Sequence, residues 1–77
     1  MALYYFDFTD RTGTYVDNEG SDLADESQLE QEAARALAEM FCDRLSLEAD
    51  ALMLIKVRDA AGLHILEVSL ALNIKHF

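Results

Sequence analysis

Two stretches of the chain carry an apolar residue at every second position, and a segment with helical spacing separates them. The alternating apolar positions are Tyr4, Phe6 and Phe8 in the first stretch, and Leu66, Val68, Leu70 and Leu72 in the second. Because successive side chains of a strand point to opposite faces, each stretch predicts a strand whose apolar face must be covered. The helical segment can provide that cover, so the pattern predicts a sheet with a helix packed on one face.

The first stretch belongs to a predicted hairpin. Residues 2–9 form its first strand, and residues 10–13 carry turn-forming side chains before a short β-prone run at residues 14–16. Gly13 suits the left-handed position of this turn, because glycine has no Cβ that would clash there. Residues 17–25 then predict an acidic loop that leads into the helix.

The second stretch belongs to another predicted hairpin. Alternation over residues 52–58 indicates a strand, and Gly62 fits the positive-φ position of the turn that follows. The returning strand starts at Leu63, runs through Ile74 and can extend to His76. Such a strand is long for a small domain.

The segment between the hairpins predicts an amphipathic helix that begins within residues 25–28. Asp25 and Ser27 are each followed three residues later by a residue, Gln28 or Glu30, that can complete a helix-capping pair. The apolar stripe of this helix contains Leu29, Ala33, Ala36, Leu37, Met40 and Phe41.

Together these elements predict an α+β fold. The helical pattern fades near residues 44–46, and residues 46–50 form a connector to the second hairpin. The element order is ββαββ, a four-stranded, mostly antiparallel sheet with one helix packed on one face. Residues 1–77 are expected to form a single domain, because a chain of this length supports only one core.

Size and composition favour association with a second copy. A chain of 77 residues is close to the size at which one core gives only a few kcal/mol of net stability, roughly 3–5 kcal/mol. Its hydrophobic content of 52% is high for so small a chain. Some apolar surface is therefore expected to be buried against another copy, which predicts a homodimer.

The charge balance excludes one class of partner and favours another. The chain has 15 acidic and 6 basic residues, and its net charge is -9. Nucleic-acid binders need a concentrated positive face, whereas here only Lys56 and Arg58 share a strand face. We therefore expect no direct binding to nucleic acid, and an acidic surface that suits a basic protein partner.

The cysteine content and the first residues bear on location. Cys42 is the only cysteine, which excludes an internal disulfide and leaves no second thiol for a zinc site. Arg35 and Arg44 are its possible basic neighbours, but a reactive thiolate would need both charges close to an exposed sulfur, so Cys42 is expected to be unreactive. The residues after Met1 contain no basic segment and no long apolar run, so neither a signal peptide nor a membrane span is expected. These features predict a cytoplasmic protein without a membrane partner.

No group of side chains demands a particular chemistry, so no catalytic, metal-binding or cofactor-binding residue is predicted. The acidic loop lacks the calcium register: with Gly20 at the sixth position of an EF-hand loop, Tyr15 occupies the first, where an aspartate is needed. His64 and His76 have no cysteine or carboxylate at metal-ligand spacing. His64 is expected to share a strand face with Leu66.

Two carboxylates, Asp7 and Glu67, could face each other across paired strands, an arrangement suited to acid and base catalysis. Lys56 and Arg58 lie on a neighbouring strand and can pair with them, which predicts cross-strand salt bridges instead. An enzyme would need a cleft that holds at least two of the available polar side chains. These side chains are Tyr5, Asp7, His64 and Glu67.

The sheet face opposite the helix is also partly apolar. One helix covers one side of a sheet, and a second apolar side is typical of a subunit interface or a binding surface. The alternative is that these side chains are isolated on the surface. The predicted interface residues are Leu3, Tyr5, Leu54, Arg58 and Ile65.

Several landmarks along the chain occur in a familiar order and spacing. They are YYFD at residues 4–7, DNEG at 17–20, EAARALAEM at 32–40, VRD at 57–59, Gly62, and VSL at 68–70. In these landmarks the chain resembles a family of small uncharacterised domains common in rhizobia and related alphaproteobacteria. The resemblance covers nearly the whole chain and implies a bacterial origin and the fold described above. It implies no activity and no catalytic residues.

These observations predict a non-catalytic protein-interaction domain that associates with itself through the exposed sheet face or the long terminal strand. One alternative is an antitoxin-like or nucleic-acid-mimicking regulator that binds a basic protein partner, because small acidic proteins can occupy a surface meant for phosphate. A second alternative is an enzyme with a site on the sheet face.

Overall fold

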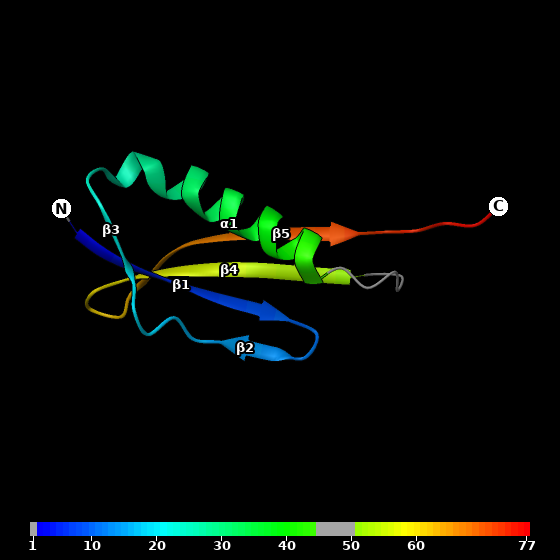
Figure 1. The fold of residues 1–77 in the computed structure, drawn as a ribbon, viewed down its shortest axis with the longest axis horizontal. Helices are drawn as coiled ribbons and strands as arrows, with labels where there is room; N and C mark the ends of the chain where they lie inside the picture. Colours follow the sequence, from blue (N-terminus) through cyan, green and yellow to red (C-terminus); the bar gives the residue numbers. More distant parts are fainter. Residues whose placement is uncertain (1, 45–50) are drawn as a thin grey trace.

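The computed structural model describes residues 2–44 and 51–77, and the predicted connector at residues 46–50 lies outside this part (Figure 1). The elements, in chain order, are β1 (Ala2–Asp10), β2 (Gly13–Tyr15), β3 (Ser21–Leu23), a 3-10 turn η1 (Glu26–Gln28), α1 (Leu29–Arg44), β4 (Ala51–Asp59) and β5 (His64–Leu72). The α+β class predicted from the sequence is confirmed.

The described strands form one antiparallel sheet in the order β2-β1-β4-β5, with β3 also paired to β1. The short strands β2 and β3 share one edge of β1, because β2 pairs only with residues 8–10 and β3 only with residues 2–4. The sheet therefore has five strands rather than the four predicted. The additional strand lies in the segment predicted as an acidic loop, whose polar residues do not show strand alternation.

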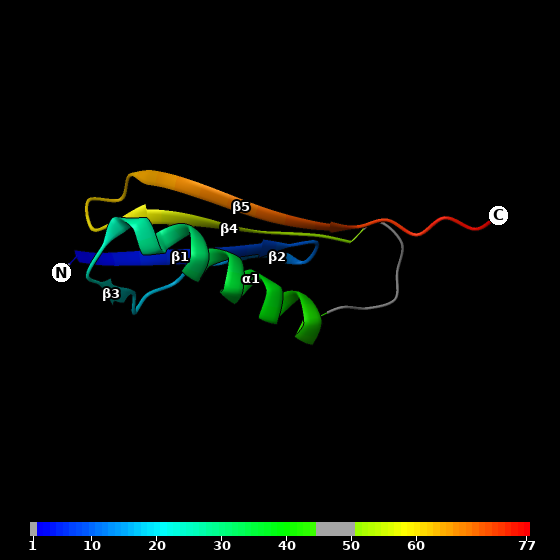
Figure 2. The ribbon, with the colours of Figure 1, turned by 90° about the horizontal axis from the view of Figure 1, so that it is seen from above.

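The helical segment begins with η1 at Glu26, within the predicted range, and α1 follows from Leu29. Asp25 is the N-cap of η1, and its side chain accepts a hydrogen bond from the Ser27 amide at 3.0 Å. The described part of α1 then runs diagonally across one face of the sheet (Figure 2). In the described part of the chain, no helix combines the length and the apolar character needed to cross a lipid bilayer.

The core lies between α1 and the face of the sheet that carries the alternating apolar residues. Its buried members are Tyr4, Phe8, Leu29, Ala33, Leu37, Met53, Ile55 and Val57. The partly buried side chains packed against them include Phe6, Met40, Phe41, Leu66 and Val68. The predicted stripe of the helix and the predicted rows of the strands therefore meet as expected. Ala33 is fully buried, and its small side chain lets the helix approach the sheet closely.

A β-bulge interrupts the pairing of β4 with β5. Val57 pairs with Leu66, but the next residue, Arg58, pairs with His64, so Ile65 is an extra residue in β5. Because directly paired residues lie on the same face, His64 shares a face with Arg58 and not with Leu66. The prediction that His64 and Leu66 share a face was wrong, since period two does not hold across a bulge.

The last strand is shorter than predicted. β5 ends at Leu72, which pairs with Ala51, the first residue of β4. Residues 73–77 continue in the direction of β5 beyond the sheet in both views (Figures 1 and 2). The radius of gyration, 13.7 Å, exceeds the roughly 11–12 Å expected for a compact domain of this length. The extended segment contributes to this difference.

Candidate functional site

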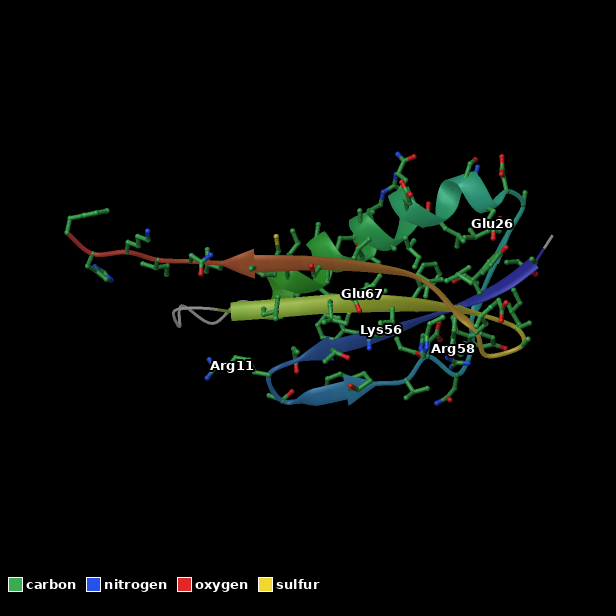
Figure 3. All side chains as sticks on the ribbon, turned by 180° about the vertical axis from the view of Figure 1, so that it is seen from behind. Arg11, Glu26, Lys56, Arg58 and Glu67 are labelled. Atoms are coloured by element: carbon green, nitrogen blue, oxygen red, sulfur yellow. The ribbon has the colours of Figure 1, made fainter. Side chains whose placement is uncertain are left out.

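A group of hydrogen-bonded polar side chains lies on the face of the sheet opposite α1, here called the uncovered face. Two cross-strand rows define it. One row contains Tyr5, Arg58 and His64, and the next contains Asp7, Lys56 and Glu67. Each row takes one residue from β1, one from β4 and one from β5. In Figure 3, Lys56 and Arg58 project from β4, and Glu67 lies on the adjacent β5.

Asp7 is the buried centre of this face, with only 8% of its surface exposed. Its Oδ2 accepts a hydrogen bond from the Arg58 Nε at 2.8 Å, and its Oδ1 accepts one from the Asp17 amide at 2.9 Å. A buried carboxylate is costly unless it is paired and hydrogen-bonded, and both conditions are met here. The predicted cross-strand salt bridge between Asp7 and Arg58 is confirmed.

Asp17 fills the gap that β2 and β3 leave on the edge of β1. Its Oδ2 accepts a hydrogen bond from the Phe6 amide at 3.1 Å, in the place where a paired strand would supply a carbonyl. Its Oδ1 accepts hydrogen bonds from the Glu19 and Gly20 amides, each at 3.1 Å. The Asp17 carbonyl in turn accepts one from the Arg58 Nη2 at 2.9 Å. Asp17 therefore joins β1, the loop after β2 and β4 into one unit.

The electrostatics of both carboxylates follow from these contacts. Burial acts to raise the pKa of Asp7, but the hydrogen bonds from Arg58 and from the Asp17 amide, together with the Arg58 charge, hold that pKa below its ordinary value. Burial likewise acts to raise the pKa of Asp17, and the hydrogen bonds from the Gly20, Phe6 and Glu19 amides outweigh it, so that this pKa is also lowered. Both groups are therefore carboxylates at neutral pH. Their lone pairs are largely occupied by protein donors.

Tyr5 stacks against the arginine of the same row. The Arg58 guanidinium carbon lies 4.4 Å from the centre of the Tyr5 ring, within the range of a cation–π contact. The loop after β2 packs against this pair. Gly20 of that loop has a positive φ of 76° and lies against the side chains of Leu3 and Tyr5. A Cβ at Gly20 would come within 3.0 Å of both side chains. The loop after β2 therefore shields part of the uncovered face, which is the face that α1 does not contact.

His64 reaches this group because of the bulge. Its Nε2 lies 4.0 Å from the Asp7 Oδ2, and its side chain is 58% exposed. We call the five residues Tyr5, Asp7, Asp17, Arg58 and His64 the Asp7 cluster. Sequence reasoning named four of them and missed Asp17, which it treated only as part of an acidic loop. The available signal was Asp17 followed three residues later by Gly20, a spacing typical of an Asx-type turn in which the aspartate accepts loop amides.

The second row does not form the carboxylate pair that the sequence suggested. Asp7 pairs with Lys56 on β4, and Lys56 pairs with Glu67 on β5, so β4 lies between the two carboxylates. The prediction that Asp7 and Glu67 could face each other across paired strands was wrong, because β1 and β5 are not neighbours. Opposite charges alternate along this row instead.

A shallow hollow of about 390 Å3 lies beside this row. Its lining contains Lys56, His64, Ile65, Leu66 and Glu67. An enzyme site was expected to need a cleft lined by at least two of the four available polar side chains. Two of them, His64 and Glu67, line this hollow. Tyr5 and Asp7 do not line it. Among the described residues there is no group of three or more His, Cys, Asp or Glu side chains arranged to hold a metal ion.

The five residues predicted as an interface lie in different surroundings. Leu3 and Tyr5 are half-buried beneath the loop after β2, and Arg58 belongs to the Asp7 cluster. Leu54 is half-buried on β4, and Ile65 is exposed at the bulge. Much of the expected apolar surface on this face is therefore occupied by contacts within the chain.

The comparison with protein families agrees with the resemblance seen in the sequence. The model of a family described as a domain of unknown function, DUF6894, matches residues 3–71. The chain belongs to this family. The match spans every strand and helix of the described structure except the last residue of β5 and the first of β1. None of the curated proteins and none of the solved structures matches the chain.

Proposed function

We propose that this DUF6894 domain is a non-catalytic protein-interaction domain that associates with itself through the free edge of β5. β5 is the last strand in the order β2-β1-β4-β5, so only one of its two edges is paired within the described chain. An edge strand presents a row of backbone N–H and C=O groups that can pair with a strand of another chain. This free edge is the observation that carries the proposal.

The distribution of exposed apolar side chains supports the same surface. Among the described residues, five of the eight large hydrophobic side chains that remain exposed belong to β5 or its flanks. These five are Leu63, Ile65, Leu70, Ile74 and Phe77. Large apolar side chains that stay exposed along one strand of a small protein favour an interaction surface there.

From Val68 onward, the edge of β5 lacks the features that usually prevent such pairing. Proteins protect edge strands with charged residues, proline or a bulge. The only bulge in β5 is at Ile65, near its start, and the segment from Val68 to Ile74 contains neither a charged residue nor a proline. Within the described part of the chain, this segment is therefore open to a second strand.

The uncovered face is a weaker candidate for the same role. Its tyrosine and arginine, Tyr5 and Arg58, stack on each other, and Gly20 lies against the ring. A partner that docked there would have to displace contacts already made within the chain. The β5 edge requires no such displacement, since its outer backbone groups face away from β4.

The proposal is tested by the mass of the protein in solution. We expect the wild-type domain to sediment as a dimer at high concentration in analytical ultracentrifugation, and Leu70→Lys, which places a charge in the middle of the edge, to shift it to the monomer. Val16→Lys is the matched control, because Val16 is an exposed apolar residue directly after β2, at the opposite end of the sheet from β5, and its replacement should leave the dimer intact. Circular dichroism checks that both variants are folded. A wild-type protein that stays monomeric at high concentration would overturn the proposal.

A further inference from the structure

The geometry of an antiparallel strand pair restricts how two copies can meet, if they associate through β5 as proposed above. A two-fold axis that relates two identical antiparallel strands runs perpendicular to the sheet. Equivalent faces then lie on the same side, so both α1 helices would cover the same side of one continuous sheet. One residue of β5 lies at the axis opposite its own copy, and the other residues pair symmetrically about it.

The limits of the regular strand point to the position of that axis. The bulge at Ile65 ends regular pairing on one side, so the regular stretch begins at Leu66. On the other side the chain stays extended beyond Leu72, where β4 no longer provides a partner within the described chain (Figure 1). We infer that the segment from Leu66 to Ile74 pairs with the same segment of a second copy about a two-fold axis at Leu70.

The side chains on the helix side of the sheet fit this register. Leu70 meets its own copy at the axis, Val68 lies opposite Leu72, and Leu66 lies opposite Ile74. Every pair on this side is therefore apolar. Leu70 and Ile74 are each 39% exposed in the single chain, and the pairing covers both. Apolar cross-strand pairs of this kind stabilise a sheet.

The side chains on the uncovered face fit as well. Glu67 lies opposite Asn73 of the second copy, and Lys75 of that copy is the diagonal neighbour, within reach of a long side chain. Two such pairs of opposite charge form in each dimer. If the axis moved to Ser69, Glu67 would lie opposite Ala71, and the tail residue Ile74 would meet His64 beyond the bulge. An axis at Ala71 would bring Glu67 directly opposite Lys75, but it would place Leu66 opposite His76. Of these three axes, only the one at Leu70 pairs every helix-side residue from Leu66 to Ile74 with an apolar residue and also keeps Glu67 within reach of Lys75.

Residues 73 and 74 gain a structural role in this arrangement. In the described part of the single chain they continue β5 without a strand beside them, and in the dimer they pair with the second copy at the start of its regular strand. They should therefore become strand only on association.

Disulfide formation tests the register. In a Cys42→Ser background, each of Ser69→Cys, Leu70→Cys and Ala71→Cys carries one cysteine. Residues directly opposite have Cβ atoms roughly 4.5–5.5 Å apart, whereas diagonal neighbours are roughly 7–8 Å apart. We expect Leu70→Cys to form the covalent dimer several-fold faster than its two neighbours under the same mild oxidation. A dimer that cross-links fastest at another position would overturn the register and leave the self-association intact, whereas a monomeric protein would overturn both.

Charge reversal gives a second test that does not touch the apolar pairs. Glu67→Lys and Lys75→Glu should each raise the dimer dissociation constant several-fold in sedimentation, because each places like charges side by side. The double variant should return it close to the wild-type value. Asp22→Lys is a control, because Asp22 is exposed on β3, away from β5. If the double variant is no tighter than the single ones, Glu67 and Lys75 are not neighbours and the register is wrong.

Discussion

The carboxylate of Asp17 is expected to stabilise the fold, and Asp17→Asn tests this with a change of only one atom. The carboxylate accepts hydrogen bonds on both oxygens, from the Phe6 amide on Oδ2 and from the Glu19 and Gly20 amides on Oδ1. An asparagine has one oxygen, so its NH2 group must face at least one of these donors. The variant therefore replaces an attraction with a contact between two donors.

The size of the effect follows from the burial of these groups. A hydrogen bond to a charged group contributes about 1.5–3 kcal/mol, and a buried donor left without a partner costs about 1–3 kcal/mol. Asp17 and Phe6 are half-buried, so water screens part of the interaction. We therefore expect the free energy of unfolding to fall by about 2 kcal/mol, which corresponds to a decrease in Tm of roughly 8–16 °C for a domain of this size.

Urea unfolding followed by circular dichroism measures this difference, and its pH dependence tests the cause. Because the pKa of Asp17 is lower in the folded protein than its ordinary value of 3.8, its contribution is present above pH 3.8 and is lost as the pH falls through the native pKa. The gap between wild type and Asp17→Asn should therefore be largest near neutral pH and shrink in acid. Asp22→Asn, at an exposed position of β3, serves as the control. A difference below about 0.5 kcal/mol, the usual range for a surface substitution, or one that does not change with pH, would refute the reasoning.

Two further substitutions test other parts of the same cluster. Arg58→Lys keeps the charge but removes the forked guanidinium that bonds the Asp17 carbonyl and stacks on Tyr5, so we expect a lower Tm in thermal unfolding, and an unchanged Tm would contradict the role of the fork. Gly20→Ala adds a Cβ at a positive φ and within 3.0 Å of the Tyr5 ring, whereas Gly13→Ala meets only strain, since nothing lies within 4 Å of that position. Urea unfolding should show Gly20→Ala to be the more destabilised of the two, by about 1 kcal/mol or more, and equal stabilities would refute the close packing.

The elements that sequence reasoning located are those whose signals are local. Alternation marked β1, β4 and β5, because each buries one face against the helix, and period two is sufficient to show it. Asp25 marked the start of the helix, because an N-cap acts within one turn. Gly62 marked the second hairpin, and its φ of 91° is the left-handed conformation expected of it.

The parts that were missed depend on contacts between distant residues. β3 is only three residues long, and it is a strand because the edge of β1 is available to it. Asp17 contacts Phe6 and Asp7, which are 11 and 10 residues away, and its role becomes visible only when β1 and the loop lie together. The strand order decided the relation of Asp7 to Glu67, and local alternation carries no information about strand order.

The bulge at Ile65 links the Asp7 cluster to the free edge. If the pairing stayed regular beyond Val57 and Leu66, Ile65 would lie opposite Arg58, and His64 would lie on the helix side of the sheet. The bulge instead places His64 on the uncovered face, 4.0 Å from Asp7. The same residue interrupts the outer edge of β5 and so sets the first residue that can pair regularly with a second copy. One inserted residue therefore accounts for both the composition of the cluster and the length of the edge available for association.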